Sequence, residues 1–222
     1  MSSVADYEFS SVTLVDCKPI GRRDFFFSRS ANLLFGPNGS GKSSLAHALC
    51  FGVWPSGGVV KIRDNGNRDR FSELLKLCLV GEDFFANFFS LGLSKLTGQY
   101  PKILHDAAEL LGPIGHKGHS VAALKDWLVC GEEGRSPAAP SPLTYMGTGT
   151  QCVMKFFFLV AIRKVLNVNC PLIIDDPFPL LDSHHRRLII GQLEIMDSQV
   201  IVFSNPSLRQ CFEDKSFDIQ EV

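Results

Sequence analysis

One short segment restricts the fold of this chain more than any other, the glycine-rich run Gly36-Pro-Asn-Gly-Ser-Gly-Lys-Ser43. It matches the pattern Gly-x-x-x-x-Gly-Lys-Ser/Thr, and it lies between an apolar run and a predicted helix, as a phosphate-binding loop requires. Glycines let the backbone turn its N–H groups toward phosphate oxygens, and the helix start adds the positive end of a dipole. Lys42 is predicted to reach the β- and γ-phosphates, and Ser43 to bind magnesium. The residues predicted to line the phosphate site are Gly36, Pro37, Asn38, Gly39, Ser40, Gly41, Lys42, Ser43 and Ser44.

A second apolar segment supplies the carboxylates that such a loop needs. Pro171-Leu-Ile-Ile-Asp-Asp176 has the pattern of a buried strand that ends in two acids, and ligands gather at the carboxyl ends of strands in parallel sheets. Asp175 is predicted to hold magnesium, directly or through water, and Asp176 to act as the general base on the attacking water. The predicted catalytic residues are therefore Lys42 and Asp176, and the predicted metal ligands are Ser43 and Asp175.

The chain divides into three predicted segments. Residues 1–54 contain strands, the phosphate loop and a helix; residues 55–142 are punctuated by glycine and mostly helical; residues 143–222 return to alternating helices and strands. Predicted strands are 11–17, 24–28, 31–35, 171–174 and 199–203, and predicted helices are 42–51, 71–79, 83–93, 101–111, 120–129, 151–166 and 183–196. Alternating strands and helices predict an α/β fold with a mostly parallel sheet.

Composition excludes several classes of protein. The 22 basic and 23 acidic residues give a net charge of −1, so the chain has no global field that would hold a polyanion. The longest uninterrupted apolar run, Phe156–Ile162, is far shorter than the ~20 residues of a membrane span, which predicts no membrane association. Seven cysteines without a Cys-x-x-Cys pair favour free thiols in a reducing cytosol, so a cytoplasmic location is predicted.

The motifs together resemble the ABC-type ATPase heads of the SMC, RecF and SbcC class. The resemblance rests on Gly36–Ser44, on Asp-Asp-Pro-Phe at 175–178 with Asp182 four residues later, and on Tyr145-Met-Gly-Thr-Gly-Thr-Gln151 at the position of the signature motif. The Asp-Asp-Pro-Phe run is most similar to the YhaN-like branch. The resemblance covers residues 11–52 and 143–206, and it implies a P-loop head with a mixed sheet flanked by helices and an inserted, mainly helical lobe.

This resemblance implies a mechanism that needs two copies of the chain. In such heads two ATP molecules with Mg2+ are sandwiched between two copies, and the signature of one copy contacts the γ-phosphate held by the other. Gly147, Thr148 and Gly149 would then act in trans, through backbone N–H groups and the dipole of the following helix. Asp182, at the D-loop position, would help to arrange the water across the interface. The implied partners are a second copy on ATP binding and an effector such as a nuclease.

The sequence also departs from the family pattern. Gly147 stands where the signature usually has Ser, Asp176 stands where many cassette ATPases have Glu, and Asn205 replaces the switch histidine. Asn can hold a phosphate or a water by hydrogen bonds, but it cannot take a proton. We therefore expect slow hydrolysis, well below the ~10 s⁻¹ that is typical of enzymes.

The middle segment, residues 55–142, is the largest departure from the family pattern. It has no heptad repeat, so it cannot build the long coiled coils that SMC-type heads carry, and a compact helical lobe is predicted instead. Lys61, Arg63, Arg68 and Arg70, with Asp64 and Asp69, form either a phosphate-backbone patch or a solvated turn with local ion pairs. Phe84, Phe85, Phe88 and Phe89 form either core packing, which is favoured, or an exposed docking stripe. His116, His119, His184 and His185 are interpreted as surface residues.

Two smaller assignments stay open from the sequence. Lys18 lies where relatives place a basic nucleotide contact, and either Gln99 or Gln151 matches the metal-sensing glutamine. Three functions fit the motifs: an SMC-like ATPase that dimerises on ATP and controls a DNA-processing or antiviral effector, as in DNA repair; a nucleotide-dependent binding module with negligible hydrolysis; or the ATPase subunit of a transporter. In the first, two alternatives stay open for DNA, direct contact or contact through a partner, because the chain has no basic field.

Overall fold

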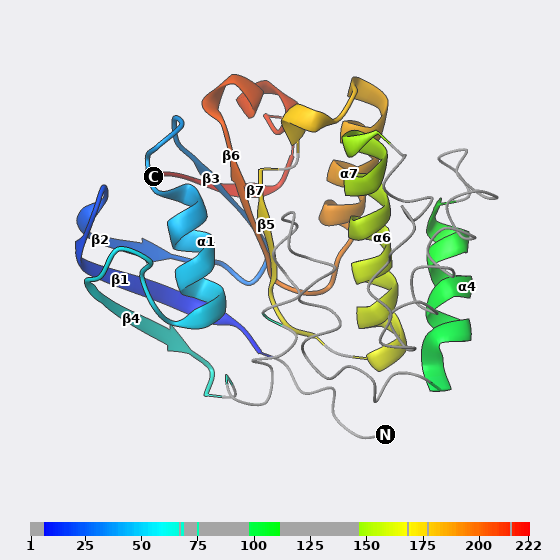
Figure 1. Cartoon of the computed structure of the whole chain (residues 1–222), viewed down its shortest axis with the longest axis horizontal. Coiled ribbons are helices and arrows are strands. Elements are labelled where there is room, and N and C mark those ends of the chain that lie inside the picture. The colour runs from blue at the N-terminus through cyan, green and yellow to red at the C-terminus, as the bar shows by residue number, and fades with distance from the viewer. Residues whose placement is uncertain are drawn as a thin grey trace, which may run out of the picture. The chain divides into compact units, whose positions relative to one another are not determined.

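The computed structural model describes residues 7–66, 68, 75, 98–111, 147–167, 169–176, 178–213 and 215–222. They belong to two compact units: unit 1 comprises residues 1–81, 168–179 and 190–222, and unit 2 comprises residues 82–167 and 180–189. Figure 1 labels the helices and strands of both. The predicted helices 83–93 and 120–129 lie outside the described residues, as do the four phenylalanines at 84–89, His116 and His119. Of the predicted helix 71–79 only Leu75 is described, and it is helical and buried. The three-segment division with boundaries at 54 and 142 therefore stays a prediction.

A parallel sheet of four strands, in the order β5-β6-β3-β7, forms the centre of unit 1. The strands are β5 (Leu172–Asp175), β6 (Val200–Ser204), β3 (Ala31–Phe35) and β7 (Phe217–Glu221). All residues of β3 and β6 are buried, because strands covered on both faces form near-continuous apolar runs. Phe35 pairs with Ser204, and Asp175 pairs with Phe203. The carboxyl ends of β3, β5 and β6 therefore lie together.

A second, antiparallel sheet has the order β2-β1-β4. Parallel and antiparallel pairing thus both occur, which confirms the expected mixed sheet, while the parallel arrangement is confined to the strands β5-β6-β3-β7. The strands of the antiparallel sheet are β1 (Phe9–Cys17), β2 (Gly21–Phe26) and β4 (Val59–Asp64). Only three residues join β1 to β2, and so short a connection permits only antiparallel pairing. β4 was not predicted, because it lies at the start of the segment expected to be mostly helical. It pairs with β1, opposite β2.

Helix α1 (Lys42–Phe51) follows the phosphate loop and packs against β5 and β6 (Figure 1). Leu45, Ala46 and Leu49 are fully buried and join the core that residues of both sheets line. Each buried leucine contributes ~1.5–3 kcal/mol relative to an exposed one. The helix ends at Gly52, which adopts a left-handed conformation (φ 77°) and donates its N–H to the carbonyl of Ala48 at 2.8 Å. This is a common way to end a helix.

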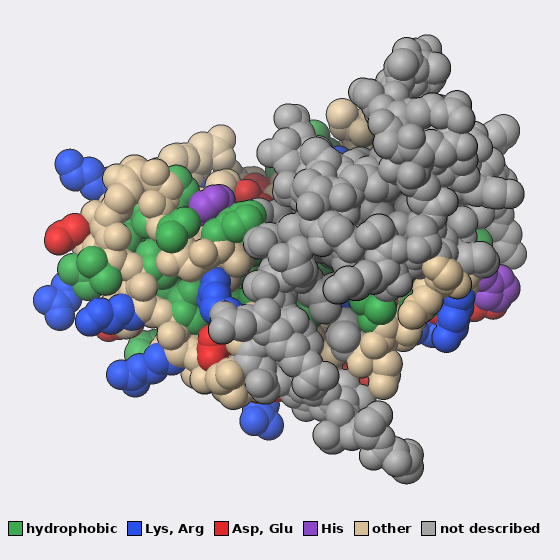
Figure 2. Space-filling view, turned by 60° about the horizontal axis from the view of Figure 1, so that its bottom comes forward, with side chains coloured by type: hydrophobic (Ala, Val, Ile, Leu, Met, Phe, Trp, Pro, Cys, Tyr) green, Lys and Arg blue, Asp and Glu red, His purple; other side chains and the backbone are tan. Residues whose placement is uncertain are grey.

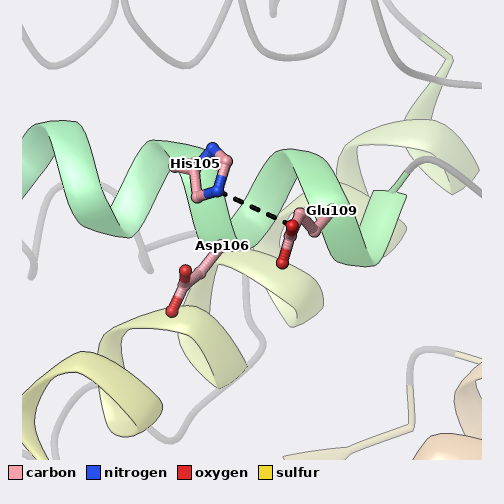
Figure 3. A group of neighbouring side chains, drawn as sticks. All are labelled: His105, Asp106 and Glu109. Atoms are coloured by element: carbon pink, nitrogen blue, oxygen red, sulfur yellow. Dashed lines mark ion pairs between the residues drawn. The ribbon is translucent and has the colours of Figure 1, made fainter.

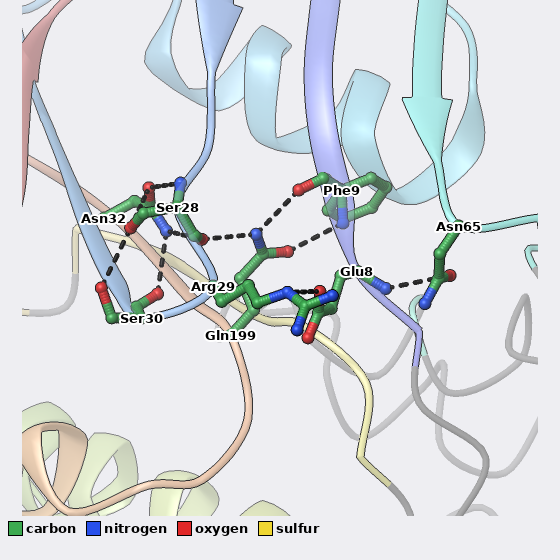
Figure 4. A network of polar contacts seen from close by, with 8 residues as sticks. All are labelled: Glu8, Phe9, Ser28, Arg29, Ser30, Asn32, Asn65 and Gln199. Carbon is green, nitrogen blue, oxygen red and sulfur yellow. Dashed lines mark hydrogen bonds and ion pairs between the residues drawn. The ribbon is translucent and has the colours of Figure 1, made fainter.

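A buried polar network links the two sheets of unit 1 (Figure 4). Gln199 is 1% exposed; its Nε2 donates to the carbonyls of Phe9 and Ser28 at 2.8 and 2.7 Å, and its Oε1 accepts the Phe9 N–H at 2.9 Å. Asn32, fully buried in β3, donates to the carbonyls of Ser28, Ser30 and Val200. These two amides fix the start of β1 to the loop before β3 and to β6.

Unit 2 contains helices α4 (Tyr100–Leu111) and α6 (Thr148–Leu166), which pack against each other. The carboxylate of Asp106, 6% exposed, lies 3.6 Å from the ammonium of Lys164. Asn167 ends α6 in a left-handed conformation, and its N–H donates to the carbonyls of Arg163 and Lys164. α4 confirms the helix predicted at 101–111. Within the part of the chain that is described, no helix is long and apolar enough to cross a membrane.

The remaining elements follow β5 along the chain. They are the 3-10 helix η4 (Phe178–Leu180), helix α7 (Ser183–Glu194) and the 3-10 helix η5 (Pro206–Cys211). α7 agrees with the predicted helix at 183–196, whereas the edge strand β7 was not predicted. Five cysteines in the described ranges, at 17, 50, 152, 170 and 211, form no disulfide.

Candidate nucleotide-binding site

The phosphate loop joins the end of β3 to the start of α1. Gly39 (φ +79°) and Gly41 (φ +101°) adopt backbone conformations that other residues rarely tolerate. At Gly36 a Cβ atom would lie 2.3 Å from the Ser40 hydroxyl oxygen, so the loop also needs glycine for close packing. Gly41 is the N-cap of α1 and has no capping side chain. The N–H groups of the first turn are therefore available to an anion.

Lys42 is held inside the loop. Its side chain is 7% exposed, and Nζ donates to the carbonyl oxygens of Gly36 and Pro37 at 2.7 and 3.0 Å. Both partners are neutral, so they occupy two of the three N–H donors of the ammonium without neutralising its charge. A buried charge of this kind is stabilised by an anion.

Asp175, at the end of β5, faces the start of α1. Burial raises the pKa of its carboxyl group, while a hydrogen bond from Ser43 and the charge of Lys42 act in the opposite direction. The hydroxyl of Ser43 and the carboxylate of Asp175 are thus in direct contact. Two oxygen ligands on neighbouring elements match the preference of Mg2+ for oxygen.

Asp176 lies just beyond the strand, in a left-handed conformation (φ 39°). Its N–H donates to the carbonyl of Phe203 at 3.0 Å, and its Oδ1 accepts the hydroxyl of Ser204 at 3.2 Å. Burial raises the pKa of Asp176, as does the charge of Asp175 to a smaller degree; the Ser204 hydrogen bond and Lys42 oppose this shift. The structure thus brings both predicted acids to the loop, whereas Gly36, Pro37 and Ser40 of the predicted phosphate site are not among the residues that line its cavity.

These residues line a cavity of about 380 Å3. The lining residues are Pro19, Asn38, Gly39, Gly41, Lys42, Ser43, Ser44, Asp175 and Asp176. Pro19 was missed by the sequence analysis, because no local pattern indicates that the β1–β2 turn reaches the loop. Trp54 holds this turn by donating its Nε1–H to the carbonyl of Lys18 at 2.9 Å. The Lys18 side chain itself is exposed.

Asn205, predicted at the switch position, follows β6 and contacts the phosphate loop. Its Nδ2 donates to Oδ1 of Asn38 at 3.3 Å. Its Oδ1 accepts the N–H of Ser207 at 3.0 Å and so caps η5. The carboxamide therefore links the end of β6 to the loop, in addition to the 3.2 Å bond from the Gly36 N–H to the Ser204 carbonyl.

The signature-like residues lie at the start of α6, in unit 2. The helix begins at Thr148, three residues before the predicted start, and Gly147 is its N-cap. Gly147 and Thr148 are exposed, and the cap has no side-chain hydrogen bond. Gly149 has a packing reason to be glycine, since a Cβ there would lie 2.5 Å from the carbonyl oxygen of Leu180. Gln151 is the fourth residue of α6, and Gln99 is exposed just before α4. The choice between these two glutamines as the metal-sensing residue stays open.

Asp182, at the predicted D-loop position, caps α7. Its Oδ1 accepts the N–H of His185 at 2.8 Å, and its Oδ2 lies 2.7 Å from Nδ1 of the same residue. These hydrogen bonds lower the pKa of Asp182. His185 thus holds the carboxylate of Asp182 in place. The interpretation of His185 as a surface residue did not include this contact.

The three described basic residues of the middle segment, Lys61, Arg63 and Arg68, lie in two different environments. Lys61 and Arg63 are exposed on β4, and Figure 2 shows Lys and Arg side chains spread over the described surface with acidic ones between them. Arg68 instead donates to the carbonyl of Leu49 at 2.8 Å. Arg70 and Asp69 lie outside the described residues.

One further cluster of potential metal ligands occurs in the described ranges, on α4 (Figure 3). His105 and Glu109 form an exposed pair at 3.6 Å. Asp106, which has a carboxylate oxygen within 4.8 Å of both, also pairs with Lys164 of α6 at 3.6 Å. Asp106, the most buried of the three residues, therefore already forms an ion pair with Lys164.

Comparisons with known proteins agree with this geometry. The family model AAA_23 (AAA domain) matches residues 11–100. No curated protein matches the sequence. Among solved structures, the chain is similar to the recombination mediator protein RecF of the RecFOR pathway (12% identity, TM-score 0.53, covering 100% of this chain and 98% of that chain). It is also similar to the SMC head domain from Thermotoga maritima (14%, TM-score 0.54, 97% and 94%).

A third similar structure is the Smc head domain of Pyrococcus furiosus bound to the C-terminal domain of ScpA (12% identity, TM-score 0.51, 92% of this chain and 91% of that chain). All these identities are low, so the likeness concerns the fold. The matched domain and the arrangement of loop, acids and sheets agree with one another. The chain therefore has the fold of an ABC-type ATPase head of the SMC and RecF class.

Proposed function

We propose that this chain binds ATP with magnesium in the loop cavity and hydrolyses it slowly, as a homodimer that closes around the nucleotide. One observation carries the proposal. Lys42, Ser43, Asp175 and Asp176 come from two elements distant in sequence, and they line one cavity whose floor is the phosphate loop.

The residues fit the groups that the proposal requires. The first turn of α1 and the Lys42 ammonium supply the positive potential that a triphosphate needs. Ser43 and Asp175 supply oxygen ligands for Mg2+, which would neutralise phosphate charge as the bond to the γ-phosphate breaks. On triphosphate binding, we expect Lys42 to exchange its two carbonyl partners for phosphate oxygens.

Asp176 is assigned the role of general base. A water molecule gives one proton to the Asp176 carboxylate while its oxygen forms a bond to the γ-phosphorus. The bond between this phosphorus and the bridging oxygen breaks, and ADP leaves with the electron pair. The slow rate follows from Asn205, which can orient the water or the phosphate but cannot accept a proton as histidine can.

The dimer is supported by the start of α6. Gly147 and Thr148 are exposed, and N–H groups in the first turn of a helix have no partner within the helix. We propose that this end binds the γ-phosphate held by a second copy. Asp182 then adds its carboxylate at the interface, held in place by its contacts with His185.

The test compares Mg-dependent ATP hydrolysis by the wild-type protein and by Lys42→Ala. Loss of the ammonium should weaken ATP binding about 10- to 100-fold, because a charge-assisted contact contributes ~1.5–3 kcal/mol, and hydrolysis should fall to background. Lys61→Ala, which changes an exposed lysine on β4, is the matched control and should keep both properties. Equal ATP affinity for wild type and Lys42→Ala would refute the proposed site.

A binding module without turnover is the second candidate, and Asn205 at the switch position favours it. ATP-driven dimerisation without phosphate release would support it over the ATPase. Control of a DNA-processing or antiviral effector, such as a nuclease, is the wider role that we propose for the dimer. A change in the hydrolysis rate on addition of DNA or of a co-purified protein would test this role.

A further inference from the structure

The end of β6 makes three contacts with Asp176, and one of them comes from a side chain. The carbonyl of Phe203 accepts the Asp176 N–H, the backbone N–H of Asn205 donates to its carboxylate, and the hydroxyl of Ser204 donates to Oδ1 at 3.2 Å. The same strand end also holds the phosphate loop, through the Gly36 N–H and the Ser204 carbonyl. The end of β6 thus contacts both Asp176, the proposed base, and the phosphate loop of the proposed nucleotide site.

We propose that Ser204 is a positioning residue, whose buried hydroxyl holds the Asp176 carboxylate in the orientation that accepts a proton from the attacking water. This inference rests on the proposed ATPase function. Ser204 is 0% exposed and is not among the residues that line the cavity. It therefore acts on the reaction through Asp176 rather than by touching the nucleotide.

The backbone at Asp176 explains why such a support is needed. A left-handed conformation (φ 39°) costs ~1 kcal/mol or more for a residue other than glycine, and it persists only where neighbouring groups hold it. A short side chain on this backbone has few rotamers that reach a water molecule. The Ser204 hydroxyl comes from a strand whose register with β3 and β5 is fixed on both sides, so it is a rigid donor.

The first experiment measures steady-state hydrolysis by Ser204→Ala. We expect kcat to fall about tenfold, while KM and the dissociation constant of ATP stay within twofold of wild type. Ser204→Thr keeps the hydroxyl and should restore most of kcat. Ser28→Ala is the matched control, because the Ser28 hydroxyl also donates over 3.2 Å to a side-chain oxygen, that of Asn32. It should leave kcat unchanged.

The second experiment does not depend on turnover. The free energy of unfolding is measured in urea for wild type, Ser204→Ala, Asp176→Gly and the double variant, since glycine accepts the left-handed backbone and removes the carboxylate. A hydrogen bond between the pair predicts that Ser204→Ala destabilises the protein less when the carboxylate is absent. Additive effects would contradict the inference, as would an unchanged kcat in Ser204→Ala or an equal loss in Ser28→Ala.

The two proposals fail in different ways. Wild-type protein that binds ATP but releases no phosphate would overturn the proposed hydrolysis, and with it the role assigned to Ser204. Wild-type protein that hydrolyses ATP at the same rate as Ser204→Ala would overturn only the role of Ser204.

Discussion

Single side chains decide how reactive the interior of this protein is. Cys152, on α6, is 6% exposed, and burial raises the pKa of its thiol to about 11, although Lys155 acts in the opposite direction. The thiolate is the nucleophilic form of cysteine. Cys211, on η5, is only partly buried, so it provides an accessible thiol in the same chain.

We expect Cys152 to be alkylated by iodoacetamide at pH 8 on the order of a hundredfold more slowly than Cys211, because few of its thiols are ionised and few are accessible. Peptide mass spectrometry over a time course measures both rates in one sample. The rate at Cys152 should rise steeply as the pH approaches 11. Equal rates at pH 8 would show that α6 opens readily.

At the scale of elements, the contacts of Gln199 decide how the sheets of unit 1 are joined. Gln199→Leu keeps a similar volume but leaves the N–H and carbonyl of Phe9 and the carbonyl of Ser28 without these partners. Each unpaired buried group costs ~1–3 kcal/mol, so we expect a loss of about 3 kcal/mol or more in the free energy of unfolding.

The matched control is Gln220→Leu. Gln220 also makes two hydrogen bonds to a strand backbone, that of Phe26, but these bonds are exposed to solvent. Water can replace them, so the expected cost is below about 1 kcal/mol. Chemical denaturation of both variants gives the comparison, and a similar loss in each would mean that the buried network adds little.

Two helix glycines should respond to alanine with opposite signs. At Gly149 in α6 the new Cβ would lie 2.5 Å from the Leu180 carbonyl, whereas at Gly191 in α7 it would meet nothing within 4 Å. We expect Gly149→Ala to destabilise the protein by ~1–3 kcal/mol through this clash. Gly191→Ala should stabilise it by up to ~1 kcal/mol, because alanine favours a helix. Thermal unfolding measures both, and stabilisation by Gly149→Ala would contradict the close approach.

The two strands that the sequence did not predict, β4 and β7, were missed for different physical reasons. β4 has an alternating pattern, with Val60 and Ile62 on the face toward the core cluster and Lys61 and Arg63 exposed. This signal is only six residues long and lies next to glycines, so the helical character expected of the longer segment obscured it. β7 is an edge strand with exposed residues, and its pairing with β3 depends on contacts distant in sequence.

The loop and the acids could be predicted because their chemistry is encoded in contiguous residues. Gly36–Ser43 and Asp175–Asp176 each carry their pattern locally, and the structure places part of the loop and both acids at one cavity. Pro19 and Ser204 could not be predicted, since their positions depend on the turn between β1 and β2 and on the register of β6. Tertiary structure alone brings them to the site.

At the scale of the whole molecule, the proposed mechanism needs a second copy. Asp176→Asn removes the base while keeping a side chain that tolerates a left-handed backbone, so ATP should remain bound. We expect light scattering to show the mass of this variant rising from 24.5 kDa to about twice that value in saturating Mg-ATP.

A second variant tests the trans contact in the same assay. Gly147→Asp adds a negative charge at the exposed N-cap of α6, where it favours the helix but repels a γ-phosphate from another copy. The combination Asp176→Asn with Gly147→Asp should bind ATP and stay monomeric. If Asp176→Asn alone stays monomeric, the nucleotide sandwich is wrong for this chain.

The left-handed backbone at Asp176 also limits how this protein can evolve. Asparagine and aspartate are among the few side chains that accept such a conformation at modest cost, and the Asp176 carboxylate reaches the Ser204 hydroxyl from it. A change to glutamate would lengthen the side chain on a backbone that disfavours it. Under the proposed mechanism, faster turnover is therefore not one mutation away, because the residue, its backbone and its serine support would have to change together.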